Sequence, residues 1–353
     1  MQAKIAVLPG DGIGPEVTTE AVNVLVQVAE CFGHSFHFEN YPGGRAAQKA
    51  QGNPLPESTL EACRKADAVL LGALDIGQSK DEAMFHAEAE RGLLAVKRAL
   101  GMTVSLRPVK PHPALHGIAP LRDELVEGVD LLLVRSLCSN VPGGCDEDMV
   151  AIVTDAACRT ARGRRHHVSV VDLAMTAQTP GLWRSVPPRV AANYPDVQVE
   201  HMPVDVCLQQ MLFDPRNLDV IVSDNILGAV LANQSFALVG TLAMLPVGGR
   251  GMGHLGVYAP ACGPMFDQAG LDSVNPIGAI LAAAMMLRHS FSLEREAEAI
   301  EHAIDSALGS GARTADIASK GERVIGTHAM GEAIAAWVCS FAGQAQRSLR
   351  AEE

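Results

Sequence analysis

Short apolar segments that suit β-strands alternate along this chain with longer segments that suit helices, and this alternation limits the fold more than any other feature of the sequence. The first strand-like segment, residues 4–8, leads into a turn rich in glycine and proline, and a helix is expected to open at Pro15-Glu16. Further strand-like segments occupy residues 68–71, 104–106, 129–134, 168–171, 197–200 and 220–222, and long amphipathic helices are expected over residues 277–287, 293–308 and 330–345. The pattern predicts an α/β fold with a substantially parallel sheet.

The size and charge of the chain exclude several classes of protein. Its 353 residues are enough for about two domains. The 28 Lys and Arg residues against 40 Asp and Glu residues give a net charge of −12, and a chain without a basic field is poorly suited to binding nucleic acid. The longest apolar stretches are too short to cross a bilayer, and the N-terminus lacks the features of a signal peptide. We therefore expect a cytoplasmic protein that binds neither nucleic acid nor a membrane.

The eight cysteines are scattered singly, at positions 31, 63, 138, 145, 158, 207, 262 and 339. They show neither the paired spacing of a zinc site nor the density of a disulfide scaffold. We expect them to be mainly reduced and mostly structural.

A proline pair, Pro187-Pro188, lies inside a segment, residues 182–194, that otherwise suits a helix. Proline inside a helix removes a backbone donor and clashes with the preceding turn. The sequence therefore predicts a helix that is broken or restarted at this pair.

A glycine-rich turn joins the first predicted strand to the first predicted helix, with the sequence Leu8-Pro-Gly-Asp-Gly-Ile-Gly-Pro-Glu16. Backbone NH groups at such a helix N-terminus can meet an anionic ligand, although the spacing differs from the dinucleotide fingerprint. A tight turn without a ligand explains the same residues.

Several longer motifs occur in a fixed order along the chain, namely Asp67-Ala-Val-Leu-Leu-Gly-Ala73, Leu106-Arg-Pro-Val-Lys110, Val129-Asp-Leu-Leu-Leu-Val-Arg135, Asn275-Pro-Ile and Arg313-Thr-Ala-Asp-Ile-Ala318. With the glycine-rich turn, this series resembles the isocitrate and isopropylmalate dehydrogenase family, in particular its isopropylmalate and tartrate dehydrogenase branch. The resemblance implies an isopropylmalate dehydrogenase-like fold of two α/β domains with a central cleft, distinct from the Rossmann fold. It implies a first, nucleotide-side domain of residues 1–98 plus 251–353. Residues 99–250 would form a second domain that builds a homodimer.

The same resemblance implies a reaction, and the residues expected to carry it are altered in this chain. Family members oxidise a malate-type 2-hydroxy acid with NAD and a divalent metal, lose a carboxylate as CO2 and protonate the resulting enol. Of the three aspartates that hold the metal, only Asp205 is present, and Ala229 and Asn233 stand at the other two positions. Magnesium or manganese binding is therefore doubtful. The tyrosine and lysine that handle protons are replaced by Pro142 and Leu173.

The positions that bind substrate are better preserved. The resemblance places Lys97, Arg107 and Arg135 around the carboxylates of a small acid, so cationic charge is kept although one arginine has become lysine. Ion pairs at strand ends are the alternative role for the two arginines.

For the cofactor, the resemblance assigns Ile13, Glu90, Gly263, Asp267, Asn275 and Asp316 to a nucleotide pocket, so that NAD binding is possible. Cys138, Cys207 and Cys262 fall at or beside family site positions, where thiol chemistry or a softer metal is one hypothesis and simple burial is the other.

From the replaced groups we expect a homologue that has lost the ancestral reaction and keeps a cleft for a small di- or tricarboxylic acid, used for different chemistry. One alternative is a non-catalytic regulatory or partner-binding homologue. A second is an active dehydrogenase of the isopropylmalate or tartrate type.

Overall fold

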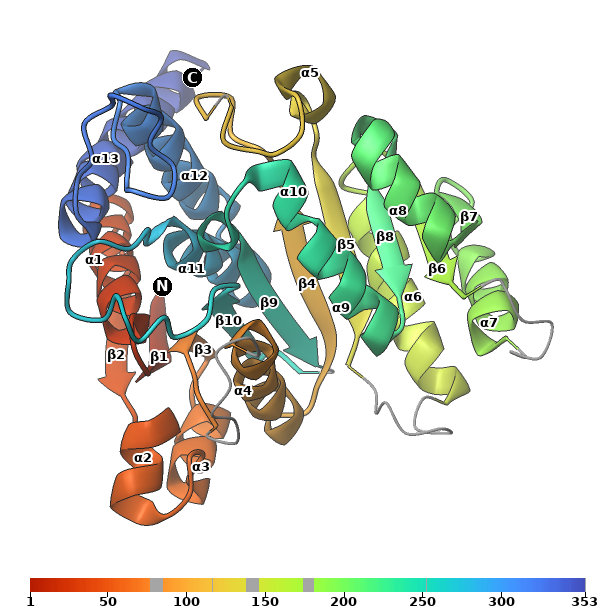
Figure 1. Cartoon of the computed structure of the whole chain (residues 1–353), viewed down its shortest axis with the longest axis horizontal. Coiled ribbons are helices and arrows are strands. Elements are labelled where there is room, and N and C mark those ends of the chain that lie inside the picture. Colours follow the sequence, from red (N-terminus) through yellow and green to blue (C-terminus); the bar gives the residue numbers. More distant parts are fainter. Residues whose placement is uncertain (77–84, 116, 138–145, 174–180, 252, 353) are drawn as a thin grey trace. The chain divides into compact units, whose positions relative to one another are not determined.

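A computed structural model describes residues 1–76, 85–115, 117–137, 146–173, 181–251 and 253–352, with the side chains of residues 85–90 and 342–352 left out of the description (Figure 1). The chain divides into two compact units. The first unit comprises Met1–Gly101, Leu242–Gly248 and Gly253–Glu353, and the second comprises Met102–Thr241 and Gly249–Met252. These transitions fall close to, but not at, the domain boundaries inferred from the resemblance, which remain a prediction.

The first unit is a sheet with strand order β2-β1-β3-β10-β9, in which the pairs β2/β1, β1/β3 and β3/β10 are parallel. Its strands are β1 (Gln2–Gly10), β2 (Ser35–Asn40), β3 (Ala68–Ala73) and β10 (Gly256–Pro260), and β9 (Pro246–Gly251) passes from this unit into the second. Its helices are α1 (Gly14–Phe32), α2 (Gly44–Gln51), α3 (Glu57–Lys65), α4 (Phe85–Ala99), α11 (Ile277–Phe291), α12 (Glu294–Gly309) and α13 (Thr327–Glu352), and a 3-10 turn, η3, spans Leu242–Met244.

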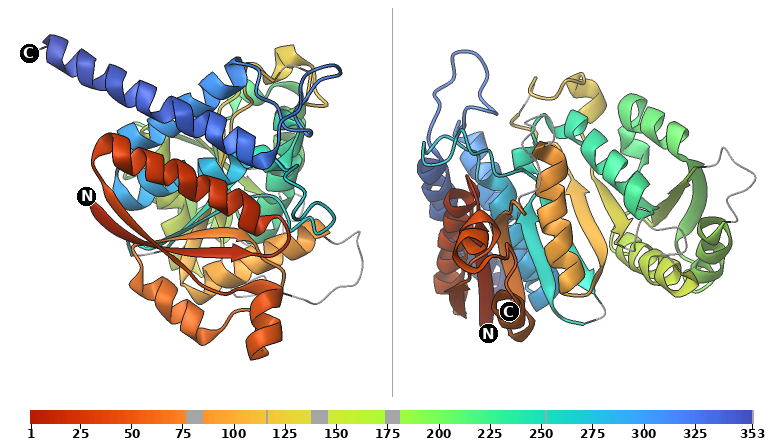
Figure 2. Two further views of the ribbon diagram at one scale, coloured as in Figure 1. Left: turned by 90° about the vertical axis from the view of Figure 1, so that its left-hand side faces the viewer. Right: turned by 60° about the horizontal axis from the view of Figure 1, so that its bottom comes forward.

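The central strands of this unit are buried on both faces, which explains their continuous apolar sequence. All six residues of β3 are buried. Helices α1 and α11 pack on the sheet, and α1 lies along α13 (Figure 2, left). The helix α11 is buried nearly all round, because α12 packs on it as well.

A disulfide joins Cys31 of α1 to Cys339 of α13, 308 residues further along the chain, with the two Cα atoms 5.5 Å apart. This bond is an exception to the expectation of reduced thiols, because the linear spacing of cysteines does not show that the first and last helices are neighbours. Cys63, Cys158, Cys207 and Cys262 are free. Cys138 and Cys145 lie outside the described residues.

The second unit is a sheet with strand order β4-β5-β8-β6-β7, in which β4 and β5 are antiparallel and the other pairs are parallel. Its strands are β4 (Met102–Val109), β5 (Leu131–Ser136), β6 (His167–Asp172), β7 (Gln198–Pro203) and β8 (Val220–Ser223). Its helices are α5 (Asp123–Val126), α6 (Glu147–Ala161), α7 (Leu182–Ala191), α8 (Val204–Phe213), α9 (Asn225–Gln234) and α10 (Phe236–Val239), and a 3-10 turn, η2, spans Pro215–Asn217. The strands of the two units belong to one sheet of ten strands, and with their helices they confirm the expected α/β class.

The helix α7 corrects one local prediction, because it runs through Pro187-Pro188 without a break. The proline pair removes two backbone donors, but Val186 and Pro187 are buried where α7 packs against α6 and the sheet. Tertiary packing of this face offsets the lost hydrogen bonds.

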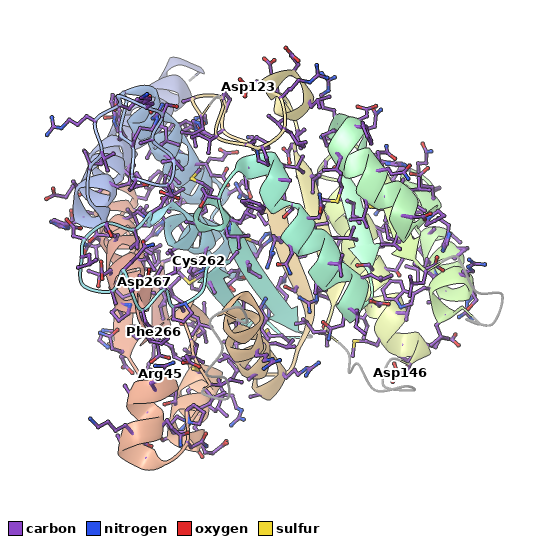
Figure 3. All side chains as sticks on the ribbon, viewed as in Figure 1. Arg45, Asp123, Asp146, Cys262, Phe266 and Asp267 are labelled. Atoms are coloured by element: carbon purple, nitrogen blue, oxygen red, sulfur yellow. A yellow bond between two sulfur atoms is a disulfide. The ribbon has the colours of Figure 1, made fainter. Side chains whose placement is uncertain are left out.

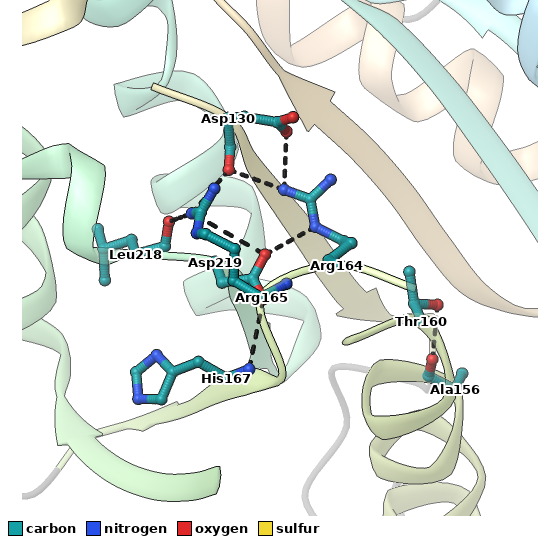
Figure 4. Close-up of polar contacts among 8 residues, drawn as sticks. All are labelled: Asp130, Ala156, Thr160, Arg164, Arg165, His167, Leu218 and Asp219. Atoms are coloured by element: carbon teal, nitrogen blue, oxygen red, sulfur yellow. Dashed lines mark hydrogen bonds and ion pairs between the residues drawn. The ribbon is translucent and has the colours of Figure 1, made fainter. Parts of the chain in front are cut away.

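The amino ends of β5, β6 and β8 are tied together by an ion-pair network (Figure 4). The buried carboxylate of Asp219 accepts a hydrogen bond from Arg164 Nε at 2.7 Å and from the backbone amide of Arg165 at 3.0 Å. Arg164 Nη2 also donates to Asp130 Oδ1 at 2.7 Å. The network fixes the chain at the end of the sheet opposite to the strands' carboxyl ends.

Candidate active site

The glycine-rich turn before α1 is closed by backbone hydrogen bonds to its neighbours. The amide of Asp11 donates to Ala73 O at 2.6 Å, that of Ile13 to Pro264 O at 2.8 Å, and that of Gly14 to Asp11 O at 2.9 Å. Gly12 has a φ of 57°, and a Cβ there would lie 1.7 Å from Pro264 O, so only glycine fits. Three amides of the turn are therefore taken by the protein, which favours the tight-turn interpretation over an anion cradle.

Two of the residues expected around the nucleotide, Asn275 and Asp316, are joined by a hydrogen bond. Asn275 Nδ2 donates to Asp316 Oδ2 at 3.2 Å, and Thr314 Oγ1 donates to Asp316 Oδ1 at 2.6 Å. Asn275 and Ile13 are buried, and Gly263 is buried beside Pro264, whereas Asp267 is exposed on the same loop (Figure 3). The structure thus brings Asn275 together with Asp316, 41 residues apart in sequence.

Two other expected positions of the first unit lie on α4. Lys97 is almost fully buried, and its Nζ donates to Gly248 O at 3.3 Å. Glu90 lies on the same helix, but its side chain is outside the description.

Arg107 and Arg135 lie on the same face of the sheet in the second unit. On the antiparallel pair β4/β5, Arg107 is opposite Leu133 and Arg135 is opposite Ser105. The two arginines are therefore diagonal neighbours, whose Cα atoms are typically roughly 7–8 Å apart. Both side chains reach α9: an Arg107 terminal nitrogen donates to Ala232 O at 3.0 Å, and Arg135 Nε donates to Asn225 Oδ1 at 2.8 Å. Two cations on one face can bind carboxylates.

The local sequence of α9 allows the Arg135 side chain to pack against this helix. Asp224 caps the helix by accepting a hydrogen bond from Leu227 N at 2.8 Å, which fixes where it begins. A Cβ on Gly228 would lie 2.6 Å from Arg135 Cγ, so the glycine leaves the room that the arginine needs.

The positions that the family uses for a metal do not fit one here. Asp205 is exposed in the first turn of α8, Ala229 has no ligating atom, and Asn233 offers only a neutral amide one helical turn later on α9. Among the described residues, no group of three or more His, Cys, Asp or Glu side chains could hold a metal ion.

The positions for proton transfer are equally changed. Leu173 follows β6 and is 53% exposed. Pro142 lies outside the described residues. The hypothesis of thiol chemistry is not supported for the two described cysteines, since burial raises the pKa of Cys207 and of Cys262 to about 12.

A cluster around Arg45 in the first unit was not found from the sequence (Figure 3). The Arg45 guanidinium stacks 3.9 Å above the centroid of the Phe266 ring, and its Nε pairs with the buried carboxylate of Asp75. Asp11 accepts hydrogen bonds from the amides of Arg45, at 2.9 Å, and Asp75, at 2.8 Å. Burial raises the pKa of Asp11, against these two hydrogen bonds, which lower it. Nothing in the spacing of Arg45, Asp75 and Phe266 along the sequence indicates that they form a cluster.

In the part of the chain that is described, no helix is both long and apolar enough to cross a membrane.

Comparisons with known proteins agree with the architecture. A sequence model of the family described as "Isocitrate/isopropylmalate dehydrogenase" matches residues 4–334. A 3-isopropylmalate dehydrogenase of Geobacillus kaustophilus is 42% identical over 97% of this chain and 97% of its own, and that of Priestia megaterium is 41% identical over 96% and 97%. The crystal structure of isocitrate dehydrogenase from Methylococcus capsulatus superimposes with a TM-score of 0.81 at 26% identity, covering 96% of this chain and 99% of that one.

The relatives overturn one expectation and confirm another. The expectation that this chain has lost its ancestral reaction is wrong, because relatives about 40% identical over nearly its whole length are named 3-isopropylmalate dehydrogenases. The resemblance read from the ordered motifs, and the fold that it implied, are confirmed. This chain is a member of the isocitrate and isopropylmalate dehydrogenase family.

Proposed function

We propose that this protein is an active dehydrogenase of a small malate-type 2-hydroxy acid, of the 3-isopropylmalate dehydrogenase kind, that uses NAD and acts as a homodimer. The identity of 42% over 97% of the chain to a protein named 3-isopropylmalate dehydrogenase carries this proposal. The arrangement of cations in the second unit supports it.

The substrate is a dicarboxylic acid, bound by Arg107 and Arg135. Their shared face and their anchorage on α9 hold two guanidinium groups in fixed positions, which suits two-point recognition of carboxylates. The resemblance assigns a third cation, Lys97, to the acid; its ammonium is buried in the first unit, where it donates to Gly248 O.

The cofactor is NAD, which accepts the hydride from the substrate carbinol. Asn275 and Asp316 are held against each other where the family binds adenine, and this pre-formed pair supports a nucleotide pocket that also includes Ile13, Gly263 and Asp267. Glu90 is assigned to the same cofactor. Leu173 and Pro142 cannot exchange protons, so neither contributes acid–base catalysis in the proposed reaction.

The homodimer is built by the second unit. Large apolar side chains are exposed on the consecutive helices α8, α9 and α10, namely Val206, Phe213, Ile226, Val230 and Phe236. Figure 1 shows where these three helices lie in the second unit. An apolar surface of this kind on a single unit is typical of an association surface, and a second copy of the chain is the partner that the homodimer requires.

The test is reduction of NAD by the purified full chain with 3-isopropylmalate, tartrate and malate, each with and without Mn²⁺. We expect NADH formation with at least one acid, and loss of most activity in Arg135→Gln, because the fork that holds the carboxylate is gone. The matched control is Arg122→Gln, which changes an exposed arginine of the same unit. Absence of NAD reduction with every acid in both conditions contradicts the proposal.

A further inference from the structure

We infer that Arg45 is a phosphate-binding residue of the nucleotide site and contacts a phosphate of the dinucleotide. This inference rests on the proposed function and adds a residue that neither the ordered motifs nor the family's pocket includes.

The guanidinium of Arg45 is fixed in place and still has free donors. Its Nε is held by the buried carboxylate of Asp75, and its plane is held by stacking on Phe266. Within the described chain, its two terminal nitrogens have no hydrogen-bond partner, and the side chain is 55% exposed. An arginine oriented in this way presents a planar pair of donors to solvent without having to lose conformational freedom on binding.

The backbone that carries Arg45 is equally constrained. Its amide donates to Asp11 Oδ1 in the glycine-rich turn at 2.9 Å. The preceding residue, Gly44, has a φ of 72°, and a Cβ there would lie 1.8 Å from Asp11 Oδ2. The first residues of α2 are therefore held against the glycine-rich turn that precedes α1.

The guanidinium reaches the loop that the family uses for the adenosine half of its cofactor. Phe266, on which it stacks, is followed directly by Asp267, and the same loop accepts the amide of Ile13 at Pro264 O (Figure 3). Arg45 therefore lies against a loop that carries Gly263 and Asp267, two positions assigned to the nucleotide pocket, and that accepts the amide of a third, Ile13.

A phosphate near this turn needs a cation from a side chain. The amides of Asp11, Ile13 and Gly14 are already bonded within the protein, and the carboxylate of Glu16 in the first turn of α1 accepts the amide of Gly270. The bonded amides cannot donate to a phosphate and the Glu16 carboxylate repels one, whereas the two terminal nitrogens of Arg45 match a pair of phosphate oxygens. Both the pyrophosphate of NAD and the 2′-phosphate of NADP offer that pair.

The experiment is calorimetric titration of the full chain and its Arg45→Ala, Arg45→Lys and Phe266→Leu variants with four ligands: adenosine, ADP-ribose, 2′-phospho-ADP-ribose and NAD. We expect Arg45→Ala to weaken the binding of a phosphate-bearing ligand by about 10- to 100-fold and to leave adenosine unchanged. Arg45→Lys should weaken binding less, because the lysine keeps the positive charge. Phe266→Leu should also weaken binding less, because the two terminal nitrogens of Arg45 remain. Circular dichroism checks that each variant is folded. Arg64→Ala is the matched control, because Arg64 is also half-exposed and paired with a carboxylate, Glu57, in the same unit.

The ligands separate the two phosphate sources. Weaker binding of ADP-ribose and NAD identifies the pyrophosphate, and weaker binding of 2′-phospho-ADP-ribose alone identifies the 2′-phosphate. Unchanged binding of all ligands in Arg45→Ala overturns the inference, as does an equal loss that includes adenosine. Wild-type protein that binds no nucleotide contradicts both proposals, whereas wild-type protein that binds nucleotides but oxidises no acid contradicts only the proposed function.

Discussion

Replacing Asp219 with alanine should destabilise this protein far more than removing a carboxylate from an exposed ion pair (Figure 4). The carboxylate is 1% exposed, and it binds Arg164 Nε at 2.7 Å and the amides of Arg165 and His167 at 3.0 and 3.3 Å. Breaking a buried ion pair costs about 3–5 kcal/mol, since the remaining charge loses its partner in a poorly solvated place. Arg164 keeps Asp130 as a second partner, so we expect a value near the lower end, about 3 kcal/mol.

The assay is unfolding by guanidinium and by heat, followed by circular dichroism. A loss of about 3 kcal/mol corresponds to a fall in Tm of roughly 6–12 °C for a unit of this size. Asp219→Asn, which keeps one acceptor oxygen, should lie between alanine and the wild type. Glu147→Ala is the control, because Glu147 and its partner Arg189 are both more than half exposed and should contribute little. Equal Tm values for Asp219→Ala and Glu147→Ala would refute the reasoning.

Three further changes test other parts of the molecule. Leu173→Lys should raise kcat by 10²-fold or more, because it adds a group that can exchange a proton at that position, and steady-state kinetics against Leu173→Met decide it. Cys31→Ser should lower the denaturation midpoint under oxidising conditions and have little effect with reductant present; equal shifts in both conditions would contradict the disulfide. The hydrogen bond that the His328 ring donates to the Glu20 carboxylate raises the pKa of His328, so the contribution of this pair to stability is complete below the pKa of the unfolded chain and is lost as the pH rises through the higher folded value. NMR titration should show that Glu20→Gln lowers that pKa.

The fold was predictable from the sequence because its causes are local. Strands buried on both faces need continuous apolar runs, as in β3, and the ordered motifs extended that pattern to a named family. The resemblance assigned Arg107 and Arg135 to one acid, and the antiparallel pairing of β4 with β5 places the two arginines on one face; their role in binding stays a prediction.

The features that were not predicted depend on contacts between residues that are distant in sequence. Arg45, Asp75 and Phe266 meet only after three separate segments are packed, and nothing in their spacing indicates a stacked guanidinium. The bond between Cys31 and Cys339 likewise requires that α1 and α13 be neighbours. The predicted break at Pro187 was wrong for the opposite reason. Proline disfavours a helix interior, but the packing of α7 against its neighbours outweighs this local preference.

The functional expectation failed because it weighed each replaced residue separately. Pro142, Leu173, Ala229 and Asn233 were taken as a sum of losses, whereas identity near 40% over nearly the whole chain links this protein to named dehydrogenases. The four replacements show that proton transfer and metal binding would need other residues than those of the family. Whether the chain oxidises an acid is decided by measuring its activity.

The first unit is assembled from the two ends of the chain, and this arrangement sets an order on biosynthesis. When residue 101 leaves the ribosome, β1 and β3 have been made, but α11, which packs on this sheet, ends only at Phe291. At about 5–20 residues per second, the wait is roughly 10–40 s. The second unit needs almost only its own contiguous segment, Met102–Thr241, and can fold within that interval. The nascent strand β3 thus waits through that interval for the helix α11 that later packs on it, while α1, already made, covers part of the same sheet.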